Sequence, residues 1–288
     1  MGFREYEISI VMKVFIFSDT HWALGRIHRD VMKQLHHDVR YTDWANFSWN
    51  EFIDNYNWCD KCITNLVAYK ALIPSFPQLD FLKCIFVSHG AVEHEGIEYD
   101  LKLKYGMVSD CLKDVYPSTI TPFLMPNGVD PENFTYAQRS GSLSKLGWCG
   151  APHVTSKQVH WARDISMYTD IPLSLATNLT YDQVRDWYQT IDILLITAIP
   201  IPYKETGPLP AFEAIVSGVP VIGTPVGNFR HIPGPKFTTV EEAVHLIGFY
   251  KQNPEELRKI AKLQYDYVLK HFTYKTLAEK WQYALEFS

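Results

Sequence analysis

The sequence lacks the features that mark several large classes of protein. No stretch approaches 18 consecutive apolar residues, the length of a membrane-spanning helix, and no dense run of lysine or arginine appears. Only 20% of the 288 residues are charged and the net charge is −5, so the overall charge gives no general attraction to nucleic acid or anionic lipid. A local basic groove and a peripheral membrane contact remain compatible with this composition.

The chain contains few cysteines, and their number is odd. Five cysteines in a chain of this length do not indicate a disulfide framework, and Cys59 and Cys62 have no second pair at the spacing of a zinc site. No early stretch combines a basic segment, an apolar core and a small-residue cleavage site. We therefore expect a reduced, soluble protein of the cytoplasm.

Two metal-binding motifs are missing as well. The chain contains no Asp-x-Asp pair of the kind that holds a divalent ion against a diphosphate. The segment "HGAVEHEG" lacks the His-Glu-x-x-His spacing of a zinc hydrolase. The sequence therefore shows no motif for a metal.

Short apolar runs alternate with amphipathic segments along most of the chain. The expected strands are residues 12–19, 83–89, 146–151, 171–177, 192–198 and 219–226. The expected helices are residues 26–37, 51–73, 156–168, 181–191 and 210–217, followed by helices from residue 241 onward. This alternation predicts an α/β protein with two wound parallel sheets. Residues 125–147, rich in Asn, Gly, Pro and Ser, look like an interdomain connection, so we place the boundary near residue 130.

The segment "YKETGPLPAFEAIVSGVPVIGTP" contains two glutamates, Glu205 and Glu213, with seven residues between them. It spans a loop after an expected strand and the start of the next helix. In a parallel sheet such loops face the ligand crevice, and a helix start offers N–H groups to an anion. If a phosphate binds at the helix start, Glu213, about one turn into the helix, is near enough to accept hydrogen bonds from a ribose. Glu205, in the loop, can reach hydroxyls further along the same ligand. The pattern indicates a ligand with phosphate between two hydroxyl-bearing ends.

This segment resembles the signature of retaining GT-B glycosyltransferases, which use nucleotide sugars. Glu205 and Glu213 are followed by "AIVSGVPVIGTPVGN", and earlier in the chain stand "SDTHWALG", "FVSHG", "PNGVDPENF" and, after "GWCGA", Lys157. The resemblance implies two Rossmann-like domains facing across a cleft: an acceptor-side domain over residues 1–130 and a donor-binding domain over residues 131–271. The last helix, residues 272–288, would return to the N-terminal domain.

The resemblance also implies a reaction. A sugar would pass from a nucleotide diphosphate sugar to an unidentified hydroxyl acceptor, a glycan, a lipid-linked glycan or another molecule, with retention of configuration. No general base is named. The donor is a substrate, and no cofactor or metal is then required, because Lys157 and helix N–H groups would stabilise the leaving diphosphate.

Carried over residue by residue, the resemblance implies that Glu213 binds the ribose, Glu205 the transferred sugar and Lys157 the diphosphate. His89 matches a histidine that lines the sugar pocket, so His89 and Glu205 are the expected catalytic residues. Gly25 matches a glycine-bearing loop near the phosphates. The rest of the expected donor site is formed by Thr206, Gly207, Leu209 and Pro210.

Several positions depart from the family's pattern, among them Gln158, which follows Lys157 where the family has glycine, and Ala23 and Leu24, where a second glycine could stand. Ala151 stands where the family usually has arginine, and Pro208, which has no N–H, stands where glycine is common. Three alternatives remain open: a nucleotide-sugar epimerase, a catalytically idle GT-B binding module and a DNA-modifying glycosyltransferase. The last would need a basic groove that the composition does not indicate, so nucleic acid is not favoured as the acceptor.

Overall fold

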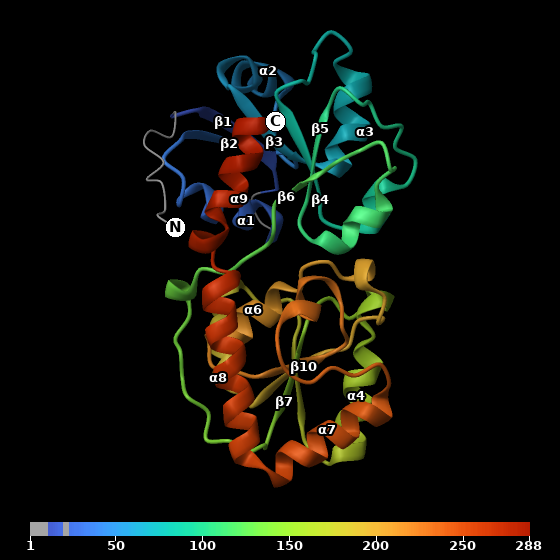
Figure 1. Ribbon diagram of the computed structural model, residues 1–288, viewed down its shortest axis with the longest axis vertical. Helices are drawn as coiled ribbons and strands as arrows, with labels where there is room; N and C mark the ends of the chain where they lie inside the picture. Colours follow the sequence, from blue (N-terminus) through green and yellow to red (C-terminus); the bar gives the residue numbers. More distant parts are fainter. Residues whose placement is uncertain (1–10, 20–22) are drawn as a thin grey trace, which may run out of the picture. The chain divides into compact units, whose positions relative to one another are not determined.

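The computed structural model describes residues 11–19 and 23–288, which form two compact units (Figure 1). Unit 1 contains the described residues up to Met107, together with Val115–Met125 and Leu277–Ser288. Unit 2 contains Val108–Asp114 and Pro126–Thr276. The middle of the "SDTHWALG" motif, residues 20–22, lies outside the described residues.

Unit 1 is built on a six-stranded parallel sheet with the order β2-β1-β3-β4-β5-β6. The strands are β1 (Lys13–Ser18), β2 (Asp38–Asp43), β3 (Lys61–Asn65), β4 (Cys84–Ser88), β5 (Lys104–Met107) and β6 (Phe123–Leu124). The helices of this unit are α1 (Ala23–Met32), α2 (Trp49–Trp58), α3 (Leu66–Ser75), most of α9 (Tyr274–Phe287) and the 3₁₀ turn η1 (Ala91–His94). A further 3₁₀ turn, η2 (Asp110–Val115), follows β5 and belongs to unit 2 except for Val115. The inner strands are buried on both faces, as their continuous apolar sequences predict.

The expected helix over residues 51–73 is wrong. The chain leaves α2 at Trp58, forms β3 and then begins α3 at Leu66. Residues Cys62 and Ile63 are fully buried in the sheet, where β3 pairs with both β1 and β4. A buried strand of this length cannot be told from a helix by apolar periodicity, which explains the error.

Unit 2 has a four-stranded parallel sheet with the order β10-β9-β7-β8. The strands are β7 (Leu146–Cys149), β8 (Leu173–Ala176), β9 (Ile193–Ile196) and β10 (Val221–Gly223). The α-helices are α4 (Val159–Thr169), α5 (Tyr181–Tyr188), α6 (Leu209–Val216), α7 (Val240–Gln252) and α8 (Pro254–His271). Short 3₁₀ turns are η3 (Pro131–Asn133), η4 (Thr155–Lys157), η5 (Pro202–Lys204) and η6 (Gly227–His231).

The helices of unit 2 cover both faces of its sheet. Helices α4 and α7 pack together, as do α6 and α8, and Figure 1 shows the two pairs on opposite sides of the strands. The core contains Trp148 from β7, Ile165 from α4 and Ile247 from α7, all almost fully buried. The predicted α/β class with two parallel sheets is confirmed. The strand order reverses between β7 and β9, because β8 lies on one side of β7 and β9 on the other.

The last helix is shared between the two parts of the chain. Residues from Leu277 onward belong to unit 1, where Trp281 is fully buried and its ring lies 5.6 Å from that of His28. Within the described chain, none of the helices has both the length and the apolar character needed to cross a bilayer.

Gly218, just after α6, allows a direct test of the close packing between the end of α6 and the segment that contains Ala137. Its φ is 82°, and a Cβ there would lie 2.1 Å from the backbone oxygen of Ala137. We expect Gly218→Ala to lower the free energy of unfolding by about 2 kcal/mol or more, measured by guanidinium unfolding. The matched control is Gly248→Ala in α7, where nothing lies within 4 Å of the added Cβ. That change should stabilise by roughly 0.5–1 kcal/mol, and equal effects from the two variants would contradict the described packing.

Candidate functional site

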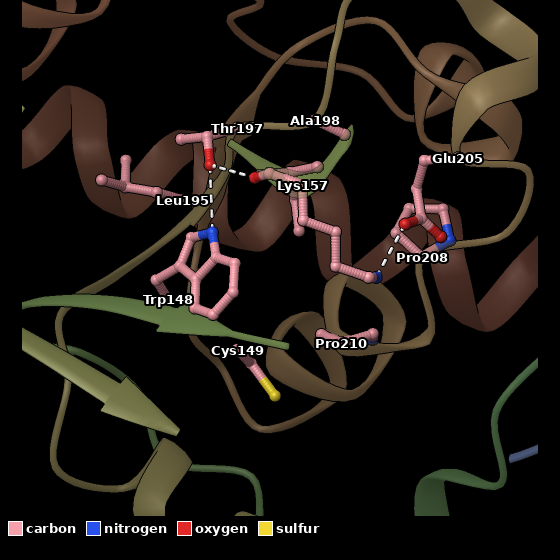
Figure 2. Close-up of a pocket in the computed structure, with 10 residues that line it drawn as sticks. Trp148, Cys149, Lys157, Leu195, Thr197, Ala198, Glu205, Pro208 and Pro210 are labelled. Atoms are coloured by element: carbon pink, nitrogen blue, oxygen red, sulfur yellow. Dashed lines mark hydrogen bonds and ion pairs between the residues drawn. The ribbon is translucent and has the colours of Figure 1, made fainter. Parts of the chain in front are cut away.

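A small pocket lies at the switch point of the unit 2 sheet, where the strand order reverses between β7 and β9 (Figure 2). Open parallel sheets bind ligands at the carboxyl ends of the strands beside such a reversal. The lining includes residues from the ends of both strands, from η4, from the loop after η5 and from the start of α6: Cys149, Lys157, Thr197, Glu205, Pro208 and Pro210.

Hydrogen bonds fix the backbone of this pocket. The indole Nε1 of Trp148 donates to Thr197 Oγ1 at 3.0 Å, and Thr197 Oγ1 donates to the carbonyl of Lys157 at 2.9 Å (Figure 2). The N–H of Ile199 also donates to the carbonyl of Ser156 at 2.8 Å. The segment that carries Lys157 is therefore held against the ends of both β7 and β9.

An ion pair joins two of the predicted site residues. Lys157 Nζ lies 2.7 Å from Glu205 Oε2, although the residues are 48 positions apart in the sequence (Figure 2). The two side chains are only 28% and 19% exposed. Partial burial lowers the local dielectric constant, so this contact is stronger than a fully exposed surface pair.

The loop after Glu205 is held by two other segments of unit 2. The carbonyl of Thr206 accepts a hydrogen bond of 2.9 Å from the N–H of Asn228. Gly207 lies so close to Asn127 that a Cβ on it would be 2.5 Å from Asn127 Nδ2. The "PNGVDPENF" and "GTPVGN" segments thus meet the Glu205 loop, and glycine at position 207 permits the close approach.

The start of α6 offers fewer N–H groups than the sequence pattern suggests. Pro208 and Pro210 have no N–H, and the N–H of Ala211 donates to the carbonyl of Pro208 at 2.9 Å. Among residues 208–211, the N–H of Leu209 is the one that remains to meet a ligand. An anion at this pocket would therefore depend more on Lys157 than on the helix terminus.

Glu213 lies one turn after Pro210 and is only 6% exposed. Its Oε2 is 3.0 Å from the hydroxyl of Tyr188, the last residue of α5, and that hydroxyl also lies 3.3 Å from the carbonyl oxygen of Pro210. The carboxylate is therefore fixed by a neutral donor, in contrast to Glu205, which is fixed by a cation.

Two predicted residues belong to unit 1. His89 follows β4 directly, and burial, with a smaller contribution from the neighbouring His28, lowers its pKa well below the usual value. Its imidazole ring is therefore neutral at physiological pH. Gly25 lies in the first turn of α1, so it is part of a helix and not of a loop. The roles given to His89 and Gly25 stay predictions.

The structure adds residues that the sequence patterns did not identify. Thr197 could have been found, because it stands at the carboxyl end of an expected strand beside the reversal of strand order. Tyr188 carries no such signal. Asn127 stands in the "PNGVDPENF" segment quoted above, but its contact with the Glu205 loop depends on tertiary packing. No group of three or more His, Cys, Asp or Glu side chains among residues 11–19 and 23–288 is placed to hold a metal ion.

Comparison with known proteins gives a family match for the C-terminal part. Residues 146–282 match a family model described as glycosyl transferase-like. No curated protein matches the sequence.

Solved structures resemble nearly the whole chain at low sequence identity. Anabaena HepE, solved in complex with UDP and glucose, has a TM-score of 0.70 and 9% identity, covering 96% of this chain and 99% of that one. Sucrose-phosphate synthase from Thermosynechococcus elongatus has a TM-score of 0.71 and 10% identity, with coverages of 95% and 98%. The lipopolysaccharide outer core galactosyltransferase WaaB has a TM-score of 0.60 and 12% identity, with coverages of 96% and 99%.

The structural matches and the family model agree with each other. The resemblance to GT-B glycosyltransferases is confirmed, and with it the assignment of the chain as a transferase. The chain has the GT-B fold, and its residues 146–282 match the glycosyl transferase-like family.

Proposed function

We propose that this glycosyltransferase moves a sugar from a nucleoside diphosphate sugar to a hydroxyl acceptor with retention of configuration. The observation that carries the proposal is the Lys157–Glu205 ion pair at the switch point of unit 2, with the buried carboxylate of Glu213 one turn after Pro210 in α6. A cation paired with one acid, together with a second acid in the helix that follows, fits a ligand with phosphates in the middle and hydroxyls at its ends. The complex of HepE with UDP and glucose supports this class of donor.

Lys157 is proposed to bind the diphosphate. When the sugar leaves, negative charge develops on the nucleoside diphosphate, and a nearby ammonium group stabilises that charge in the transition state. Lys157 can provide this contact by exchanging the Glu205 carboxylate for a phosphate oxygen. The exchange would release Glu205 to accept hydrogen bonds from the hydroxyls of the sugar.

Glu213 is proposed to bind the ribose hydroxyls. Its carboxylate is held 3.0 Å from the Tyr188 hydroxyl, and a carboxylate oxygen is the kind of acceptor that the hydroxyls of a diol require. We further propose that the reaction takes place in the cytoplasm and requires no metal, since Lys157 supplies the positive charge at the diphosphate. The acceptor is proposed to be a carbohydrate or another hydroxyl compound.

Variants of the three charged residues test the donor site. We expect Lys157→Met and Glu213→Ala each to raise the Kd for the nucleoside diphosphate by roughly 10- to 100-fold, the loss of one charge-assisted hydrogen bond. Glu205→Ala should leave this Kd unchanged or lower it, because the carboxylate no longer competes for Lys157, while kcat falls by about 100-fold. Calorimetry and transfer assays in the presence of a chelator measure both quantities.

The matched control is Lys204→Met. Lys204 is exposed and adjacent to Glu205, so its removal changes the net charge equally without touching the pocket. If Lys204→Met and Lys157→Met weaken nucleotide binding to the same extent, a general electrostatic effect explains the data and the donor site is misplaced.

Tyr188→Phe tests the positioning of Glu213. The change removes only the hydroxyl that lies 3.0 Å from Glu213 Oε2. We expect nucleotide affinity to fall by roughly fivefold to tenfold, corresponding to one buried hydrogen bond, and kcat at saturating donor to change little. Tyr168→Phe, at an exposed position of α4, is the control and should have no effect. Unchanged affinity in Tyr188→Phe would show that the ribose does not bind Glu213.

The stereochemistry of the product tests retention. Proton NMR of the product formed from a donor of α configuration should show an α linkage, and a β linkage would contradict the proposal. Incubation of the protein with the donor but without an acceptor distinguishes a transferase from an epimerase. An epimerase would convert the donor sugar, and a transferase would not.

A catalytically idle binding module is the second candidate. It is favoured by Ala151 in place of the family's arginine and by the loss of N–H groups at Pro208 and Pro210, which leave fewer donors for a diphosphate. Such a module would bind the nucleotide sugar but release no nucleotide with any acceptor tested.

A further inference from the structure

A hydrogen-bonded turn follows β4 in unit 1. His89 and Gly90 leave the strand, and the 3₁₀ turn η1 begins at Ala91. The carboxylate Oε2 of Glu93 accepts a hydrogen bond of 2.9 Å from the backbone N–H of His89. Glu93 thus ties the chain back onto the first residue after the strand.

Ser88 holds the same turn from the strand side. Its hydroxyl donates to the carbonyl of Gly90 at 3.3 Å and lies 2.7 Å from Nε2 of His94. The other ring nitrogen of His94 is hydrogen bonded to the hydroxyl of Tyr99, and the ring of Tyr116 packs against His94 edge-on at 4.5 Å. The contact between Glu93 and His89 therefore belongs to an ordered turn whose other end is also fixed.

We propose that Glu93 is a positioning residue for His89. Its ionised carboxylate holds the backbone N–H of His89 and so fixes the direction in which the imidazole ring leaves the end of β4. This inference rests on the proposed function and on the expectation from the GT-B resemblance that His89 lines the pocket for the transferred sugar. No part of the signature resemblance extends to Glu93.

Among the titratable side chains of this turn whose pKa is shifted, Glu93 has a pKa near neutral pH. Burial raises its pKa to about 7, although the hydrogen bonds from the His89 N–H and from Ser88 act in the opposite direction. Burial lowers the pKa of His94 to about 4, and burial together with Glu93 raises that of Tyr99 to about 12. The titratable side chains around this turn come from the loop, from η1, from the segment after η2, from α1 and from α3: His89, His94, Tyr99, Tyr116, His28, Tyr69 and Lys70.

The direction of the pH effect follows from the charge of the acceptor. Above neutral pH Glu93 is a carboxylate, and a charged acceptor holds an N–H more strongly than a neutral one. Below neutral pH it is a carboxylic acid, and its hold on the N–H of His89 weakens. Turnover that depends on the placement of His89 should therefore rise with pH around neutrality.

The pH profile of kcat tests this inference in four proteins: wild type, Glu93→Gln, Glu93→Ala and Glu95→Gln. We expect the wild-type kcat to rise about fivefold with an apparent pKa near 7, the effect of strengthening one hydrogen bond by about 1 kcal/mol, with KM for the donor little changed. Glu93→Gln should lose the pH step, because its amide oxygen accepts at every pH. Its kcat should exceed that of Glu93→Ala, which has no acceptor. Glu95→Gln, at an exposed neighbouring position, should keep the wild-type step.

An NMR measurement detects the hydrogen bond between the His89 N–H and Glu93 independently of catalysis. In protein labelled with ¹⁵N-histidine, the backbone amide proton of His89 should shift with a midpoint near pH 7 in wild type and remain constant in Glu93→Gln. If the His89 amide of the wild type does not titrate, or if the kcat step persists in Glu93→Gln, the inference about Glu93 is wrong and the proposed function is unaffected. A wild type that transfers no sugar from any nucleotide sugar overturns the proposed function, and the inference with it, even if the amide titrates.

Discussion

The candidate site depends on one electrostatic contact, the ion pair between Lys157 and Glu205. The two residues follow different strands, β7 and β9, and a parallel sheet brings the carboxyl ends of its strands to one edge. The bond from Trp148 through Thr197 to the carbonyl of Lys157 fixes the backbone on one side. Removing either charge would leave the other partly buried and unpaired, which is costly. The pair therefore holds a partly buried cation at this edge of the sheet without leaving its charge uncompensated.

The two glutamates of the signature segment have different surroundings, and this difference supports different roles. Glu205 faces an ammonium group that can change partners, whereas Glu213 is buried beside the hydroxyl of Tyr188 in a fixed position. A mobile partner suits the part of a ligand where charge develops, and a fixed carboxylate suits recognition of a group that does not react. Because Pro208 and Pro210 remove N–H groups from the start of α6, the proposed binding of a diphosphate depends more on Lys157 than on the helix terminus.

The sequence predicted those features that local pattern determines. The strands that end at Ser88, Cys149 and Ile196 were expected from their apolar runs, and the spacing of the two glutamates placed them around one loop and helix. The strand β3 was missed because four buried residues within a longer apolar stretch carry no periodicity of their own. The contacts that Tyr188 and Asn127 make were also missed, because they join segments far apart in the chain and no local pattern encodes them.

The most direct test is a crystal structure of the protein with a nucleoside diphosphate bound. The account predicts a phosphate oxygen within hydrogen-bond distance of Lys157 Nζ, the 2.7 Å contact between Lys157 and Glu205 broken, and the ribose hydroxyls on Glu213. A complex in which that ion pair is intact and the phosphates lie away from the switch point of the unit 2 sheet would contradict it.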